Sequence, residues 1–154
     1  MKELKIQPIR NGTVIDHITP GTAIKVLRIL NIPRAGATSA VTAAMNVTSS
    51  VNVHKRKDIV KIEDRELDPH ELDKIALISP EATVNIIREY DVAAKHRVRV
   101  PEIVTGIVKC PNPNCVSNHE PVRSAFRTVR DQPPALRCQY CERLVEEVAD
   151  HLLP

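Results

Sequence analysis

Apolar and polar residues alternate with the period of a β-strand in several short stretches of the first hundred residues. The clearest is 58–63, where charged side chains alternate with Ile and Val, and 83–87 is rich in β-branched residues. Asn11-Gly12 supplies the chemistry of a hairpin turn or a bulge within the first stretch. The segments predicted to be extended are residues 4–18, 38–48, 58–63, 83–87 and 89–100.

Two stretches carry the signals of a helix instead. Thr22 can cap the run 23–30, which has too many apolar positions for a solvent-exposed helix and fits one that packs on a sheet. Asp68, Pro69 and Glu71 combine an N-cap, a proline at the first helical position and a capping-box glutamate. A second helix is therefore predicted to begin directly after Asp68.

The order of these elements predicts an α+β fold. Strand, helix, strand, strand, helix, strand is the βαββαβ order of a ferredoxin-like sandwich, with extra extended segments at both ends. Two helices would cover one face of an antiparallel sheet and leave the other face free for a ligand or partner. Pro101-Glu102 is the predicted linker, which divides a first domain, residues 1–100, from a small all-β, zinc-ribbon-like domain, residues 101–154.

All four cysteines fall in the last 45 residues, as Cys110-x4-Cys115 and, after a gap of 22 residues, Cys138-x2-Cys141. Each pair can supply two thiolates from one tight turn, and the two turns together can close a sulfur tetrahedron around Zn²⁺. Four protein ligands leave no open position for water, so the predicted site is structural, with one zinc ion per chain. Because a piece of about 50 residues cannot depend on an apolar core alone, metal binding and folding are expected to be one event there.

Other interpretations of the cysteines stay open at this point. A four-thiolate iron site would use the same ligands, and a zinc enzyme would need an open coordination position. A redox Cys138-x2-Cys141 would normally lack a second pair upstream. Two disulfides would require an oxidising compartment, and the amino terminus interrupts every short apolar run with charge. Since no run of 18 apolar residues exists either, the chain is predicted to be soluble, cytoplasmic and without a membrane partner.

The charge balance permits an anionic partner without requiring nucleic acid. The net charge is +3 and the isoelectric point is about 8.7. Tyr90, Phe126 and Tyr140 are the only aromatic residues, so no series of stacking platforms exists for a single strand. A zinc-ribbon nucleic-acid-binding module is the alternative function, since arginines of the carboxy-terminal piece could contact phosphates. These are Arg123, Arg127, Arg130, Arg137 and Arg143.

The sequence contains no catalytic constellation. Glycine-rich phosphate loops and the G-x-S-x-G motif are absent. Asp16 and His17 are neighbours on a predicted strand, so they are expected to point to opposite faces and not to share a proton. Lys57, Lys61 and Lys95 lie on or beside predicted strands, and their convergence over a sheet face would match the charge of a nucleoside triphosphate.

Four motifs in this order resemble the regulatory chain family of aspartate carbamoyltransferase. They are Gly12–Ile18, Arg56–Glu63, Ala82–Asn85 with Tyr90, and Cys110–Cys115. The similarity runs over nearly the whole chain. It implies a non-catalytic subunit whose amino-terminal domain binds allosteric nucleotides and whose zinc domain holds a separate catalytic chain.

The resemblance also implies specific partners and residue roles. Regulatory chains of the family pair as dimers that bridge catalytic trimers, and CTP, often with UTP, inhibits the first committed step of pyrimidine synthesis while ATP activates it. Asp16 would face the ribose hydroxyls, Lys61 the base and ribose, and Lys95 with His17 the triphosphate. The remaining residues implied to line the base or phosphate pocket are Ile9, Asn85, Tyr90 and Val92. The metal ligands would be Cys110, Cys115, Cys138 and Cys141.

Overall fold

The computed structural model describes residues 8–32, 38–49 and 55–153. Within these ranges, the first half of the chain forms a five-stranded antiparallel sheet in the order β2-β3-β1-β4-β5. We call this sheet and its helices the amino-terminal unit. Its elements are β1 (Gly12–Ile18), α1 (Ala23–Ile29), β2 (Val41–Thr48), β3 (Arg56–Glu63), α2 (Pro69–Ile78), β4 (Thr83–Arg88) and β5 (Asp91–Arg97).

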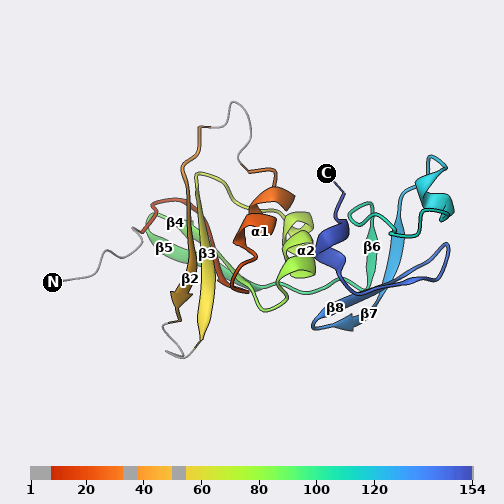
Figure 1. The fold of residues 1–154 in the computed structure, drawn as a ribbon. Coiled ribbons are helices and arrows are strands. Elements are labelled where there is room, and N and C mark those ends of the chain that lie inside the picture. Colours follow the sequence, from red (N-terminus) through yellow and green to blue (C-terminus); the bar gives the residue numbers. More distant parts are fainter. Residues whose placement is uncertain (1–7, 33–37, 50–54, 154) are drawn as a thin grey trace.

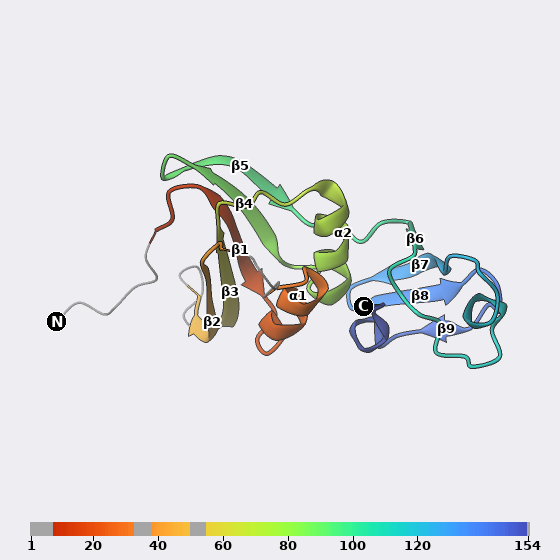
Figure 2. The same cartoon turned by 90° about the horizontal axis from the view of Figure 1, so that it is seen from above.

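The first four strands and the two helices follow the ferredoxin-like order that the sequence predicts, and β5 extends the sheet beyond β4. Both helices lie on the same side of the sheet, between it and the carboxy-terminal strands (Figures 1 and 2). The α+β class is therefore confirmed. Among the residues that the structure describes, no helix lies over the opposite face, which we call the open face.

The remaining elements form a second, four-stranded sheet in the order β6-β7-β8-β9. We call this the carboxy-terminal unit. Short 3₁₀ turns η1 and η2 lie before β7 and after β9. Its elements are β6 (Ile103–Thr105), η1 (Val116–Asn118), β7 (Ala125–Asp131), β8 (Pro134–Cys138), β9 (Leu144–Val145) and η2 (Val148–His151).

The two helices begin in different ways. The capping box of α2 forms as predicted, because Glu71 N–H donates to Asp68 Oδ1 at 2.9 Å and Asp68 N–H donates to Glu71 Oε1 at 3.2 Å. Thr22 occupies the N-cap position of α1 as predicted, but its side chain does not cap the helix. Its hydroxyl donates instead to the Thr19 carbonyl at 2.7 Å.

A buried carboxylate from β3 supplies the missing acceptor at the start of α1. Asp58, which is 0% exposed, accepts the N–H groups of Gly21 and Ala23 at 2.9 and 3.1 Å. Its other oxygen accepts Asn46 N–H at 2.7 Å, where β2 bulges and Asn46 has a φ of 57°. One side chain therefore joins α1, β2 and β3, a long-range cap that local sequence signals do not reveal.

The predicted extended segments 4–18 and 89–100 have different outcomes. Residues 4 to 7 of the expected amino-terminal strand lie outside the described residues, and Gly12 begins β1 with a φ of 141°. A Cβ atom on Gly12 would lie 2.1 Å from the Ile62 carbonyl oxygen, so this approach of β1 to β3 requires glycine. The expectation of a continuous extended segment from residue 89 is wrong, because Glu89 and Tyr90 both have positive φ and form the hairpin turn between β4 and β5.

Two apolar clusters form the cores of the two units. The larger lies between the first sheet and its helices, around Ile15, Val60 and Ile75. The second lies around Phe126 and Leu136 of the carboxy-terminal unit and includes Cys110, Cys115 and Cys138, with Cys141 packed against it. Within the described ranges, no helix is long and apolar enough to span a bilayer.

Leu77 links the two clusters. It belongs to α2, yet it is 1% exposed and packs in the carboxy-terminal cluster. Ile29, Val100 and Leu152 contact both clusters. The carboxy-terminal core is therefore completed by a side chain from the other unit, which the sequence analysis did not anticipate.

Candidate functional site

The four cysteines converge as the spacing predicts. Cys110 and Cys115 come from the loop before β7, Cys138 ends β8, and Cys141 follows in the turn to β9. The Sγ atoms of Cys110 and Cys141 are 3.6 Å apart, those of Cys115 and Cys138 are 3.7 Å apart, and all four lie within 4.8 Å of one another. A tetrahedral ion with metal–sulfur bonds of about 2.3 Å has sulfur edges of about 3.8 Å, so the four sulfurs fit such an ion. None of these distances matches a disulfide bond of about 2.05 Å.

Asparagines within and after the first cysteine pair fix the first ligand loop. Asn118 Nδ2 donates to the carbonyls of Cys110 and Asn112 at 2.9 and 2.8 Å. Asn112 also receives the N–H of Cys115 on its carbonyl and that of Asn114 on its side chain, both at 3.0 Å. These contacts hold the loop without using metal, so the asparagines position the ligands. The sequence analysis missed them, although Asn at 112, 114 and 118 around a two-cysteine loop is a turn signal.

Backbone hydrogen bonds hold the second ligand turn, between Cys138 and Cys141. Cys138 N–H donates to the Arg143 carbonyl at 3.0 Å, and Glu142 N–H donates to the Cys138 carbonyl at 2.9 Å. Glu142 has a φ of 66°, which closes the turn tightly enough for Cys138 and Cys141 to face one ion. The cysteines other than Cys141 are buried.

Without metal, the thiols differ in their acidity. Burial raises the pKa of Cys110 to about 12, and burial also raises the pKa of Cys138. Burial acts in the same direction on Cys141, but hydrogen bonds from Arg143 N–H, Asn112 and the other thiols outweigh it and lower its pKa to about 7. A metal must therefore displace protons from Cys110 and Cys138 near neutral pH. A closed set of four thiolates can stabilise the fold but offers no position for a reacting water.

The open face carries a row of side chains across all five strands. The paired residues are Thr42 of β2, Lys61 of β3, Val14 of β1, Asn85 of β4 and Lys95 of β5. Directly paired residues on antiparallel strands point to the same face. The strand register therefore brings together Lys61, Asn85 and Lys95, which lie far apart in the sequence.

Asp16 stands in the next row of the open face, paired with Thr83. Its carboxylate accepts an ion pair from Lys57 Nζ at 2.9 Å, and only 10% of the Lys57 side chain is exposed. Burial lowers the pKa of Lys61, and the nearby Asp16 carboxylate partly offsets this. Lys57 and Lys61 thus both lie in the field of Asp16, whereas the sequence analysis treated Lys57, Lys61 and Lys95 as equivalent cations.

Asp16 and His17 do not lie on opposite sides of the sheet, which corrects the sequence-based expectation. The register of β1 shifts between Ile15 and Ile18, and His17 has a φ of 56°. His17 Nδ1 lies 3.1 Å from Thr83 Oγ1, the residue that pairs with Asp16. The bulge therefore turns His17 toward the open face.

A shallow hollow of about 480 Å³ lies at this end of the open face. Its basic lining is His17, Lys55, Lys95 and Arg97, with Glu81 as the carboxylate. Lys55 and Arg97 are functional candidates that the sequence analysis missed. Arg97 follows Lys95 by two residues on β5, which places both on one face of the strand.

The other predicted pocket residues surround the same sheet. Val92 pairs with Ile87 and is 59% exposed, and Tyr90 is 63% exposed at the turn between β4 and β5. Tyr90 N–H donates to the Arg10 carbonyl at 2.9 Å, so this turn lies beside the segment that contains the buried Ile9. The structure thus gathers Asp16, His17, Lys61, Asn85 and Lys95 on the open face, whereas Ile9 and Tyr90 lie beside the turn between β4 and β5. Their assignment to a ligand stays a prediction.

Comparison with known proteins covers both units. The family described as "Aspartate carbamoyltransferase regulatory chain, allosteric domain" matches residues 4–99, and "Aspartate carbamoyltransferase regulatory chain, metal binding domain" matches residues 102–149. A curated relative of that name from Methanocella arvoryzae is 56% identical over 99% of this chain and 97% of its own length. Relatives of the same name are 52% identical in Methanothermobacter thermautotrophicus, over 94% of this chain and 90% of theirs, and 54% identical in Hyperthermus butylicus, over 97% and 94%.

Proposed function

The chain belongs to the aspartate carbamoyltransferase regulatory chain family, and from this premise we propose that it binds CTP, UTP and ATP on its open face. Through its metal-binding domain it would hold the catalytic chain, so that nucleotides adjust the first committed step of pyrimidine biosynthesis. A nucleotide can change the response of that partner only by binding two states of the assembly unequally.

The observation that carries this proposal is the polar row on the uncovered sheet face. Lys61, Asn85 and Lys95 share one row, in which Val14 lies between Lys61 and Asn85, and Asp16 lies in the adjacent row. A carboxylate accepts hydrogen bonds from a ribose diol, and ammonium groups neutralise phosphate. We assign Asp16 to the ribose, Lys61 to the base and ribose, and Lys95 with His17 to the triphosphate.

The less polar residues would complete the pocket. Val92 projects from the open face beside Ile87, and Asn85 offers both amide donor and acceptor to a base edge. Tyr90 and Ile9 would line its far end, beside the turn that Tyr90 N–H closes on the Arg10 carbonyl. The hollow around Lys95 and Arg97 supports the triphosphate end at the opposite side.

Calorimetric titration of the full chain with CTP and ATP tests the open face. Lys61→Ala and Lys95→Ala each remove a charged donor, so each is expected to weaken binding by about 1.5 to 3 kcal/mol. Arg127→Ala, an exposed cation on β7, is the matched control and should bind as the unmodified chain does. Wild-type affinity in both lysine variants would place the nucleotide elsewhere.

For the metal centre we propose one structural Zn²⁺ bound by Cys110, Cys115, Cys138 and Cys141. Soft thiolates in a closed tetrahedral set favour zinc over harder divalent ions. Large apolar side chains are exposed near the ligand loops, at Val116, Val122, Tyr140 and Leu144. Exposed apolar side chains of this kind fit an interface with the catalytic chain. Metal analysis by mass spectrometry would distinguish zinc from iron.

We also propose that two copies of the chain associate through β2. This strand is the edge of the sheet, its residues are mostly exposed, and Val41 and Met45 expose 38% and 52% of their surface. An exposed apolar edge is a template for a second strand. Sedimentation of the Met45→Lys variant should show a weaker dimer than the unmodified chain, and an unchanged dimer would contradict the assignment.

The nucleic-acid alternative gains little from the arginines of the carboxy-terminal unit. Arg127 lies 3.7 Å from Glu102, Arg130 lies 3.5 Å from Glu146, and Arg137 donates to the Glu142 carbonyl. We propose that the chain works without nucleic acid. Thiolates that bind a metal need a reducing compartment, so we also propose a cytoplasmic location.

A further inference from the structure

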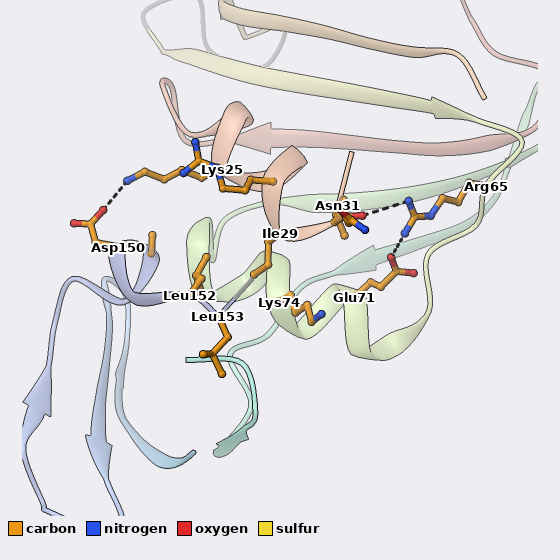
Figure 3. A pocket seen from close by; sticks show the side chains of 12 residues that line it. Lys25, Ile29, Asn31, Arg65, Glu71, Lys74, Asp150, Leu152 and Leu153 are labelled. Carbon is orange, nitrogen blue, oxygen red and sulfur yellow. Dashed lines mark hydrogen bonds and ion pairs between the residues drawn. The ribbon is translucent and has the colours of Figure 1, made fainter. Parts of the chain in front are cut away.

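A groove of about 710 Å³ lies where α1 and α2 meet η2 and the residues that follow it (Figure 3). This volume lies within the range of small-molecule pockets. The groove is separate from the open face, because its walls are the two helices that cover the opposite side of the sheet (Figures 2 and 3). We call it the junction groove, since both units contribute to its lining.

The junction groove has a surplus of positive charge. Its lining holds four cations, Lys25, Arg28, Arg65 and Lys74, against the carboxylates of Glu71 and Asp150, which leaves two positive charges in excess. A phosphate monoester carries a charge of about −1.5 to −2 at neutral pH, which matches this surplus. A triphosphate would bring more negative charge than the groove balances.

Two of the four cations are already held by carboxylates. Lys25 pairs with Asp150 at 3.2 Å, and Arg65 pairs with Glu71 (Figure 3). In the part of the chain that the structure describes, Arg28 and Lys74 join no carboxylate. They come from different helices and both line the groove, so the groove offers an anion a guanidinium fork and an ammonium group.

The groove also has an apolar side. Ile29 and Leu152 pack against the cores beneath it, and Leu153 is 38% exposed at its edge (Figure 3). A ligand with only a charged head would leave this surface in water. A ligand with an apolar body would cover it and gain the hydrophobic contribution of the buried area.

We propose that the junction groove binds a small phosphate monoester that carries an apolar group. Arg28 and Lys74 recruit the phosphate, while Ile29, Leu152 and Leu153 contact the apolar group. Because the groove joins α1 and α2 to the carboxy-terminal end of the chain, its occupant contacts both units. This site does not depend on nucleotide binding at the open face.

The test is calorimetric titration of the full, metal-loaded chain with phenyl phosphate. Inorganic phosphate lacks the apolar body and benzyl alcohol lacks the charge, so both are expected to bind at least tenfold more weakly. Arg28→Ala and Lys74→Ala should each reduce the affinity for phenyl phosphate at least tenfold. Lys61→Ala and Lys95→Ala, on the open face, should leave it unchanged, which separates this site from the proposed nucleotide pocket.

Three results would overturn the proposal. One is the absence of saturable binding of phenyl phosphate at about 10 mM, near the weakest range of specific association. Another is a loss of binding in the open-face variants with none in Arg28→Ala and Lys74→Ala. The third is equal affinity for inorganic phosphate and phenyl phosphate, which would remove the apolar contact. Circular dichroism of both groove variants checks that they fold, as expected for an exposed Arg28 and a half-buried Lys74.

Discussion

The two candidate sites of this chain are assembled in opposite ways. The metal centre takes all its ligands from two short loops of one small unit, and a bound ion would join them directly. The open-face site takes its polar residues from four strands, β1, β3, β4 and β5, and only the hydrogen-bonded register of the sheet brings them together. A site built from loops therefore depends on its ligand, whereas a site built on a sheet depends on the core beneath it.

The largest expected effect comes from removing one ligand of the metal centre. Cys138→Ser leaves three thiolates for a closed site, so the carboxy-terminal unit should lose its metal and its order, because structural zinc contributes about 10 kcal/mol or more in small domains. Hydrogen exchange should become fast in β7 and β8 while β1, β3 and β4 stay protected. Gln139→Ala, an exposed neighbour, is the control. Protected β7 and β8 in metal-free Cys138→Ser would show a unit that folds without its ion.

The acidity of the thiols makes the metal affinity depend on pH, which is not expected of the core beneath the sheet. Cys110 and Cys138 have raised pKa values, to about 12 for Cys110, so both carry protons at pH 7 in the metal-free chain. Metal binding displaces at least these two protons, and affinity should therefore fall as pH falls, by at least about 100-fold per pH unit. Competition with a chromophoric chelator between pH 6 and pH 8 measures the slope. An affinity that does not vary with pH would exclude thiolate ligation.

On the sheet side, Asp58→Asn is expected to cost about 3 to 4 kcal/mol of unfolding free energy. The buried carboxylate accepts three backbone N–H groups, and an amide accepts fewer and weaker bonds in its place. Urea denaturation followed by circular dichroism gives the value. The exposed Asp64→Asn is the matched control, since Asn tolerates its φ of 59°. Equal stability of the two variants would mean that Asp58 does not hold α1 and β2 on β3.

Features built from residues close in sequence could be predicted from the sequence, whereas features built across the sheet could not. Cysteine spacing predicts the metal cluster because its ligands are local, and the capping box of Asp68 and Glu71 is local as well. The regulatory, non-catalytic class is confirmed through the family, whose motifs the sequence carries. The side-chain cap of α1 and the orientation of His17 were predicted incorrectly, because Asp58 acts across the sheet and a bulge re-aims His17.

Leu77→Ala tests how far the core of the carboxy-terminal unit depends on the amino-terminal unit. This side chain comes from α2 but is buried in the carboxy-terminal cluster, so its loss should cost about 2 to 3 kcal/mol there. Hydrogen exchange in β7 and β8 should speed up more than in β1 and β4. Leu72→Ala lies on the same helix but packs against the amino-terminal cluster, so it should show the reverse pattern. Identical patterns in both variants would contradict a role for Leu77 in joining the units.

The smallest expected effect concerns the charged contact between the units. Lys25 and Asp150 pair at 3.2 Å, but their side chains are 42% and 57% exposed, so water screens the attraction. A double-mutant cycle with Lys25→Ala and Asp150→Ala should give a coupling of about 0.5 kcal/mol, which about 1 M salt removes. Leu77→Ala measured in the same salt keeps its full cost, because apolar burial does not depend on charge screening. A coupling above about 2 kcal/mol that survives salt would show that charge rather than apolar packing holds the two units together.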